Sequence, residues 1–295
     1  MSNQLKTIVL LGALSAILIA IGGAMGPDFL TYAVVMAAVL NLGAYFFSDK
    51  IVLASQRAQE VTPEQAPELH AIVDELSQKA GIPKPRVYVI PQAQPNAFAT
   101  GRSPKVGVVA VTEGILQLLD ARELRGVLAH ELSHVKNRDV LISSIAATIS
   151  AAVSYVAHVV GFFGGRRDDG RGPSAVQSLL LLLVAPIAAT LIQFGVSRSR
   201  EFEADKSGAA LCGDPEALAQ ALLKLDASAR AIPAQVEPAM ASLFIVNPFG
   251  AVRNVARLFS THPSTEERVR RLRAMEGQPQ IETTRGWSSS APPTL

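Results

Sequence analysis

The most informative stretch of this sequence is His130-Glu131-Leu132-Ser133-His134, which has the spacing of a metal site on a helix. Residues four apart on a helix lie one turn apart on the same face, so the imidazoles of His130 and His134 can both reach one metal ion. Glu131 lies roughly 100° further round the helix. There its carboxylate can take a proton from a metal-bound water. The run therefore predicts a metal-dependent hydrolase, and the alternative is two surface histidines on an amphipathic helix.

The neighbouring residues independently predict the helix that this site needs. Asp120, followed three residues later by Glu123, forms a capping box that starts a helix. We expect the helix to continue to about Asn137. Its apolar face is formed by Leu124, Val127, Leu128 and Leu132.

A catalytic zinc site usually takes a third protein ligand and keeps one position open for water. Cys212, the single cysteine, is a poor candidate because thiolate sites generally use several cysteines. One branch of zincins adds a glycine and a third histidine, but Asn137 and Val140 stand at those positions here. Another branch takes a glutamate from a later helix. Glu201 is the candidate for that role.

Glu201 and Asp205 share one face of the helix predicted over 197–212. Glu201 can bind the ion while Asp205 accepts the outer N–H of a ligand histidine, for which we favour His130. Glu203 lies about 200° round the helix from Glu201 and is expected to point away. The spacing alone leaves open a second interpretation, in which these residues are only a charged helix face leaving the membrane.

The composition points to a membrane protein. Of the 295 residues, 49% are apolar and 18% are charged, whereas soluble domains are about 25% charged. A net charge of +2 gives no reason to expect a nucleic-acid partner. One cysteine excludes a disulfide framework within the chain.

Four uncharged stretches are long enough to cross the hydrocarbon core of a bilayer. The first two form a hairpin joined by Gly26-Pro27-Asp28, and the positive-inside rule puts both of its basic flanks in the cytoplasm. A signal peptide over 7–25 is the alternative, disfavoured because a second span follows at once. The four stretches are 7–25, 29–47, 140–164 and 174–196.

The second pair of stretches is a weaker candidate for spanning. Its connecting loop at 166–171 carries three arginines, against the positive-inside bias. The alternative is a hairpin that lies on the membrane surface or is buried in protein.

The remaining segments predict a small β-sheet and several helices. Residues 86–90 and 105–111 have the pattern of strands, and 96–101 that of a short edge strand. Thr62-Pro63 predicts a helix start, with Gly81 ending that helix. Further starts are predicted at Asp214-Pro215 and at the capping box of Ser264 and Glu267.

We therefore expect a mainly α membrane protein with a small β-sheet, made of a zincin-like metalloprotease domain (a gluzincin if Glu201 is the third ligand) and two apolar helical hairpins. Five segments follow from this division. They are a transmembrane hairpin at 1–48, the first half of a cytoplasmic protease domain at 49–139, the second apolar hairpin at 140–196, the second half of the domain at 197–276, and a disordered tail at 277–295.

Three motifs together resemble a known family. They are His-Glu-Leu-Ser-His-Val-Lys-Asn-Arg-Asp at 130–139, Ser-Arg-x-x-Glu-Phe-x-Ala-Asp at 197–205 after a long apolar hairpin, and Thr-His-Pro at 261–263. In this order they are similar to the HtpX zinc metalloproteases, membrane-bound homologues of the CAAX prenyl endopeptidases. The resemblance covers nearly the whole chain, from the N-terminal hairpin to about Arg273.

The resemblance implies one Zn²⁺ per chain, bound by His130, His134 and Glu201, with Glu131 as general base. It gives His262 a role as oxyanion donor, the alternative being a loop residue with no catalytic part. It also implies a multi-pass protein of the bacterial inner membrane with its active site facing the cytoplasm. The implied function is a stress-related quality control of membrane proteins.

We expect the substrate to lie extended along an edge strand, as an added strand. The residues chosen for that edge are Asn96, Ala97, Phe98 and Ala99. Both halves of the site lie close to apolar stretches in the sequence, so misfolded membrane proteins or unfolded polypeptides are the expected substrates.

Three other functions compete with this one. A zinc-binding but inactive membrane scaffold would carry the same ligands. A transporter or channel is disfavoured because the charged residues all lie outside the predicted spans. A CAAX-type prenyl-peptide endopeptidase fits less well than the HtpX-like form with its four spans and small intervening segment.

Overall fold

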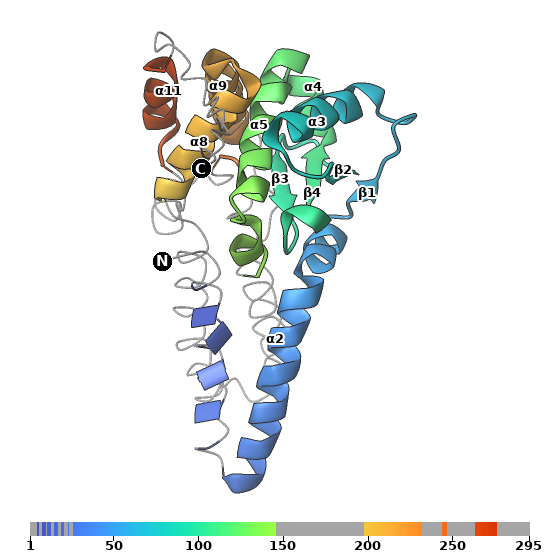
Figure 1. Cartoon of the computed structure of the whole chain (residues 1–295), viewed down its shortest axis with the longest axis vertical. Coiled ribbons are helices and arrows are strands. Elements are labelled where there is room, and N and C mark those ends of the chain that lie inside the picture. The colour runs from blue at the N-terminus through green and yellow to red at the C-terminus, as the bar shows by residue number, and fades with distance from the viewer. Residues whose placement is uncertain are drawn as a thin grey trace, which may run out of the picture.

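The computed structural model describes residues 26–145, 198–231, 244–246 and 263–275, together with isolated positions between 5 and 23. These residues form a mainly helical protein with one small sheet, as predicted (Figure 1). The helices are α2 (Pro27–Ser55), α3 (Pro67–Ala80), α4 (Glu113–Leu118), α5 (Ala121–Lys136), α8 (Arg198–Cys212), α9 (Pro215–Ala231) and α11 (Thr265–Arg273). The strands are β1 (Gln59–Glu60), β2 (Arg86–Ile90), β3 (Ala97–Thr100) and β4 (Val108–Thr112).

The sheet has the order β1-β2-β4-β3, so β3 is an edge strand, as expected for residues 96–101. Strands β2 and β4 are parallel, and β3 runs antiparallel to β4. The strand predicted from residue 105 begins only at Val108 because Pro104–Val106 form a 3-10 turn. One face of the sheet packs on the main helical core, and the other packs on Val52 and Leu53 at the end of α2.

Helix α5 lies between the sheet and the group formed by α8, α9 and α11 (Figure 1). Its predicted capping box is present. Asp120 Oδ1 accepts the Glu123 backbone N–H at 2.8 Å, and Glu123 Oε2 accepts the Asp120 N–H at 3.1 Å. The predicted apolar face is buried in the core with α3, α8, α9 and the sheet. The helix is therefore fixed on several sides before any ligand binds.

Two glycines allow other helices to approach α5 closely. A Cβ on Gly208 of α8 would lie 2.8 Å from the backbone nitrogen of His130. A Cβ on Gly126 of α5 would lie 2.8 Å from the backbone nitrogen of Leu218 in α9. Real Cβ atoms do not approach backbone so closely, so both contacts require glycine.

The predicted start of α3 at Thr62-Pro63 is wrong, because the helix begins at Pro67. The Thr62 carbonyl accepts the backbone N–H groups of Gln65 and Ala66, each at 3.1 Å. The Gln65 side chain in turn accepts the Thr62 N–H at 2.8 Å. This closed turn precedes the helix, and the second proline, not the first, takes the first helical position. Gly81 ends the helix in the left-handed conformation with φ of 68°, as predicted.

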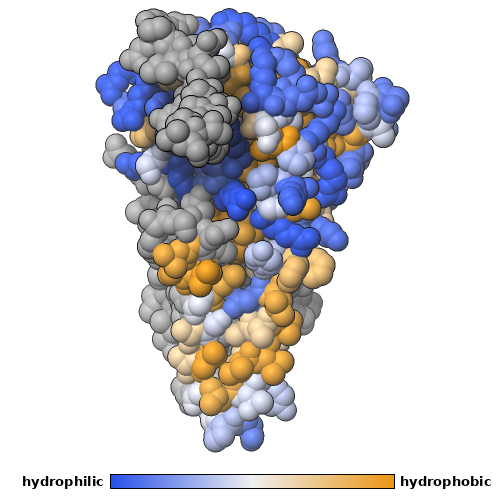
Figure 2. Space-filling view, in the orientation of Figure 1, coloured by the Kyte–Doolittle hydropathy of each residue, from blue (hydrophilic) through white to orange (hydrophobic). Residues whose placement is uncertain are grey.

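Among the described residues, α2 is the one helix long and apolar enough to cross a membrane. It projects from the rest of the molecule, and its surface is largely hydrophobic (Figures 1 and 2). Asn41 Nδ2 donates to Leu11 O at 3.2 Å and to Ser15 Oγ at 2.6 Å, so part of the preceding stretch lies beside α2. The predicted stretch 174–196 lies outside the described residues, as do the tail at 277–295 and all of 140–164 beyond residue 145.

Replacing Gly208 by alanine is expected to push α8 away from α5. Overpacking of this kind typically costs about 1–3 kcal/mol of stability, so the thermal midpoint should fall. Bound metal per chain should fall with it, because α8 carries Glu201. Thermal denaturation in detergent and metal analysis of the purified protein measure both effects.

The matched control is Gly126→Ala, which creates an equally close contact on the same helix but against α9. It should lower the thermal midpoint while keeping the metal. A Gly208→Ala protein with normal stability and full metal content would contradict this description of the α5–α8 contact.

Candidate metal centre

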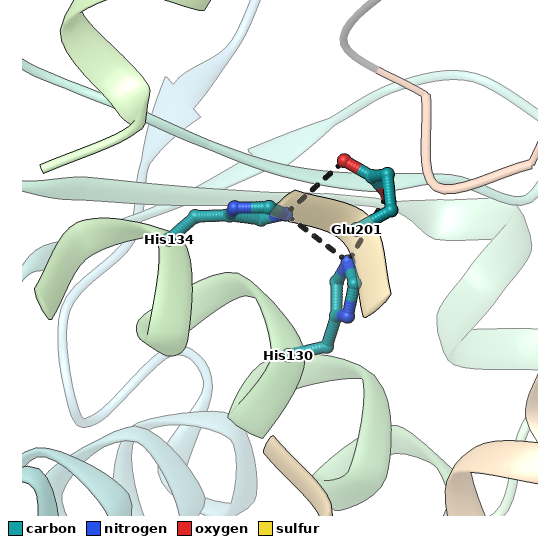
Figure 3. A group of neighbouring side chains, drawn as sticks. All are labelled: His130, His134 and Glu201. Carbon is teal, nitrogen blue, oxygen red and sulfur yellow. Dashed lines mark hydrogen bonds and ion pairs between the residues drawn. The ribbon is translucent and has the colours of Figure 1, made fainter. Parts of the chain in front are cut away.

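Three side chains from α5 and α8 converge on one point (Figure 3). The Nε2 atoms of His130 and His134 lie 3.2 Å apart. Glu201 Oε2 lies 3.7 Å from His130 Nε2, and Glu201 Oε1 lies 3.6 Å from His134 Nε2. His130 and Glu201 are buried and His134 is partly buried, so these polar groups face one another inside the protein.

The outer nitrogen of each imidazole has its own carboxylate. Asp205 Oδ1 lies 3.0 Å from His130 Nδ1, which is the pairing favoured from the sequence. Asp139 Oδ2 lies 3.2 Å from His134 Nδ1. A carboxylate at Nδ1 favours the tautomer that carries its proton there, which leaves the Nε2 lone pair free to bind a metal. Both imidazoles are therefore oriented for a shared ion.

The sequence analysis missed the role of Asp139. This residue follows the end of α5, where Arg138 adopts a left-handed conformation with φ of 59° and interrupts the helix. The Asp139 backbone N–H then donates to the His134 carbonyl at 3.0 Å, which returns its carboxylate to the ring. The only sequence signal was the acidic residue five positions after a ligand histidine.

Arg268 was also missed. It is buried on α11 and donates to both carboxylate oxygens of Asp205, from Nη2 at 2.6 Å and from Nε at 2.8 Å. Its Nη1 donates to the Ile245 carbonyl at 2.7 Å. Sequence reasoning placed Arg268 only in a basic helix, because nothing in its local pattern separates it from the exposed arginines around it.

Glu131 is buried beside the convergence point and is held by the edge strand. Its Oε2 accepts the backbone N–H of Ala99 in β3 at 3.0 Å. Burial raises the pKa of Glu131 to about 7, and the charge of His134 offsets only part of that desolvation. A carboxyl group with a pKa near neutrality is suited to accept and return a proton.

The other titratable groups respond to the same burial and charges. Burial lowers the pKa of His130. Burial acts in the same direction on His134, but the hydrogen bond to Asp139 and the charge of Glu201 outweigh it and raise that pKa to about 9. Burial opposes ionisation of Asp205, yet the charge and hydrogen bonds of Arg268 hold its pKa well below the usual range.

The four residues chosen for substrate binding lie next to Glu131 but are buried. The Thr112 N–H donates to the Asn96 carbonyl at 2.9 Å. Backbone groups alternate in an antiparallel pair, so those of Ala97 and Ala99 point away from β4. Phe98 packs instead in the apolar cluster with the end of α2. Any substrate contact along this edge would therefore use these backbone groups, since the side chains are buried.

Three further residues that the sequence singled out lie away from the metal centre or outside the described residues. Glu203 is exposed, as expected for a residue pointing away from the site. Cys212 is buried, and its sulfur lies 3.6 Å from the Ala209 carbonyl, so it is not among the three converging ligands. His262 lies outside the described residues.

Residues 63–276 match the profile of Peptidase family M48. The chain belongs to this family. It is 51% identical over 281 residues to a Protease HtpX homolog of Pelotomaculum thermopropionicum, covering 92% of this chain and 99% of the relative. It is 50% identical over 284 residues to a Protease HtpX homolog of Methylibium petroleiphilum, covering 94% and 99% of the two chains. These matches confirm the resemblance to HtpX proteases, and this M48 chain is a membrane metalloendopeptidase.

The fold also resembles a solved structure. The crystal structure of S. mikatae Ste24p matches with a TM-score of 0.50 and 18% sequence identity. The match covers 92% of this chain and 65% of that one. At this identity the likeness shows a common fold and nothing more.

Replacing Glu201 by glutamine should reduce bound metal well below one ion per chain, because a neutral amide is a much poorer ligand than a carboxylate. Metal analysis of protein purified in detergent measures this. The matched control is Glu203→Gln, two residues along the same helix and exposed. Equal metal content in the two variants would remove Glu201 from the ligand set.

Proposed function

We propose that this metallopeptidase is a zinc endopeptidase integrated in the bacterial inner membrane, and that it hydrolyses peptide bonds in misfolded or damaged membrane proteins. The observation that carries the proposal is the convergence of His130, His134 and Glu201, with Glu131 beside them. Relatives about half identical over nearly the whole chain are named as HtpX proteases, which supports the same activity here.

Zinc is the metal that fits this donor set best. Zinc bonds to imidazole nitrogen and carboxylate oxygen of about 2.0–2.2 Å, arranged as a tetrahedron, separate neighbouring ligand atoms by about 3.3–3.6 Å. The two imidazole nitrogens lie 3.2 Å apart, and each has its own oxygen of Glu201 at 3.6 or 3.7 Å, so the carboxylate faces both nitrogens. With one atom taken from each residue, the three donors lie within 4.8 Å of one another. Three protein ligands leave a fourth position for water, the arrangement of catalytic zinc. When bound, zinc polarises the scissile carbonyl and acidifies the attacking water.

Glu131 is proposed as the general base and then the general acid. Water adds its oxygen to the scissile carbonyl carbon, and Glu131 takes one of its protons. The carboxyl group then passes that proton to the leaving nitrogen, so the C–N bond breaks to give a carboxylic acid and an amine. The acid then ionises in water. The Ala99 N–H donates to Glu131 Oε2, so it orients the carboxylate. We propose His262 as a donor to the oxyanion.

The surrounding charges support a divalent ion at this position. Glu201, Asp205 and Asp139 are buried carboxylates around two imidazoles. Arg268 pairs with Asp205, and Arg200 Nη1 lies 4.0 Å from Asp139 Oδ1. Buried charges are costly unless they are paired. A dication between the imidazoles and Glu201 would add to this compensation at the point where the three side chains converge.

The edge of β3 is the proposed substrate platform. An extended peptide added beside β3 would bond to the backbone of Ala97 and to the Ala99 carbonyl, which point away from β4. The Ala99 N–H is already used by Glu131. This mode reads the substrate backbone and not its side chains, which suits a protease that acts on many unfolded segments. Oligomeric assembly is not needed for such a site, since all the proposed groups come from one chain.

The proposed location follows from α2 and its basic flanks. A span at 29–47 with Lys50 and Arg57 at its end supports a cytoplasmic metalloprotease domain, because basic flanks are typical of cytoplasmic loops. The stretches at 7–25, 140–164 and 174–196 are the further proposed spans. The site would then lie close to the membrane, within reach of membrane-protein substrates.

Glu131→Gln should keep the metal and lose peptide cleavage by about 10²-fold or more, because glutamine cannot carry the proton. Cleavage of casein by the detergent-purified variant, together with metal analysis, measures both. Glu203→Gln serves as the control of equal charge change. A Glu131→Gln protein with full activity would overturn its proposed role, and a wild-type protein with metal but no cleavage of any substrate would favour the inactive scaffold.

The proposed topology makes a labelling prediction. In a Cys212→Ser background, a cysteine replacing exposed Asp28 should react with a membrane-impermeant maleimide added to intact spheroplasts. A cysteine replacing exposed Gln78 of α3 should react only after the membrane is permeabilised. The reverse pattern would place the metalloprotease domain outside the cytoplasm.

A further inference from the structure

A second site lies away from the metal centre, where α2 meets the sheet. A cavity of about 530 Å³ opens there between the end of α2, the start of β2 and the loop that joins β3 to β4. Neither the proposed catalysis nor the packing of the core uses it. Its polar lining is Asp49, Lys50, Lys84, Arg86, Arg102 and Lys105.

The cavity is strongly basic, with five cationic side chains against one carboxylate. Asp49 Oδ2 lies 3.7 Å from Arg86 Nη2, so the single acid is already engaged. Within the described part of the chain, Lys50, Arg102 and Lys105 have no carboxylate at ion-pair distance. Clustered, uncompensated cations of this kind favour an anionic ligand, and arginine and lysine together favour phosphate.

Two aromatic side chains complete the lining and are themselves exposed. Phe46 is 46% exposed and Phe47 is 51% exposed. The Lys50 ammonium lies 5.6 Å from the Phe47 ring centroid, and the Arg102 guanidinium lies 5.4 Å from that of Phe46. Exposed rings with cations above them are typical of the boundary between hydrocarbon and headgroups. The cavity thus has an apolar side and a basic side.

Its position along α2 matches the depth of lipid phosphates. A span that begins at Phe29 reaches the thickness of the hydrocarbon core after roughly 20 residues. That point falls at Ser48 and Asp49, immediately after the two phenylalanines. Figure 2 shows the same change, from a largely hydrophobic surface along α2 to a largely hydrophilic one over the domain.

We propose that this cavity binds the phosphate of an anionic phospholipid headgroup, with Arg102, Lys105 and Lys50 as its main contacts. The proposal rests on the membrane span of α2 proposed above. Arg102 and Lys105 lie on the loop between β3 and β4, and this loop packs tightly on α5, since a Cβ on Gly107 would lie 3.1 Å from Val135 Cγ1. A bound headgroup would tie the hairpin that carries the edge strand to the membrane surface.

The test uses the full-length protein, purified in detergent with added phosphatidylglycerol or phosphatidylcholine and examined by native mass spectrometry. The wild type should retain one phosphatidylglycerol in preference to phosphatidylcholine. Each basic residue near an anionic lipid typically strengthens binding about fivefold. Arg102→Gln with Lys105→Gln should therefore weaken phosphatidylglycerol binding by about 30-fold. Lys50→Gln alone should weaken phosphatidylglycerol binding by about fivefold.

The matched control is Arg230→Gln with Lys79→Gln, which removes the same charge from exposed positions outside the cavity and away from the end of α2. It should retain the lipid as the wild type does. Equal lipid loss in the two double variants would overturn the site, as would equal retention of phosphatidylcholine by the wild type. The metal content of each variant, unchanged from wild type, shows that the fold is intact.

Two further measurements complete the test. One distinguishes a lipid phosphate from free inorganic phosphate, and the other tests whether α2 spans the membrane. Displacement of phosphatidylglycerol by millimolar inorganic phosphate, with phosphate bound in its place, would assign the cavity to free phosphate and overturn the lipid proposal. A protein that remains soluble without detergent would overturn the span of α2 and this site together. Normal membrane insertion with unchanged lipid retention in the cavity variants would overturn this site alone.

Discussion

The close packing of α8 on α5 is the contact on which the rest of the structure depends. The two histidines are local neighbours on one helix, but their carboxylate partners Glu201 and Asp205 come from a distant part of the sequence. Gly208 lets the backbone of α8 approach the backbone of His130, at a distance that a Cβ would prevent. Only at that distance can two carboxylates one turn apart reach both nitrogens of the same imidazole.

This contact gathers negative charge inside the protein, and the remaining elements are arranged to compensate it. Arg268 brings α11 to Asp205 through two hydrogen bonds, and its third contact holds the Ile245 carbonyl. The Ile245 N–H in turn donates to Asn96 Oδ1 at 3.2 Å, next to the edge strand. The metal centre, α11 and the proposed substrate edge are therefore linked through a chain of buried polar contacts. Such a network is favourable only when every member is satisfied, which couples the integrity of the fold to the proposed ion.

The sequence predicted what depends on helical periodicity, and it could not predict what depends on a break in a helix or on packing between distant elements. His130, His134 and Glu131 follow from a four-residue spacing on one helix, and Glu201 with Asp205 follows from the same spacing on another. Asp139 reaches His134 only because the left-handed Arg138 interrupts the helix just before it, and Arg268 reaches Asp205 only through the packing of α11. The Ala99 contact to Glu131 joins a strand to a helix, so no local pattern reports it. The helix start predicted at Thr62-Pro63 was wrong for a similar reason. A turn closed by the Gln65 side chain occupies these residues, so the helix begins at Pro67 instead.

The central claim is that peptide cleavage depends on one zinc ion held by this cluster. The most direct measurement is a zinc titration of the full-length protein after its metal has been removed by a chelator, with casein cleavage and bound zinc followed together. The account predicts that cleavage is absent in the stripped protein and returns in proportion to bound zinc, reaching its maximum at one ion per chain. Cleavage that survives complete removal of metal, or that fails to follow zinc occupancy, would contradict it.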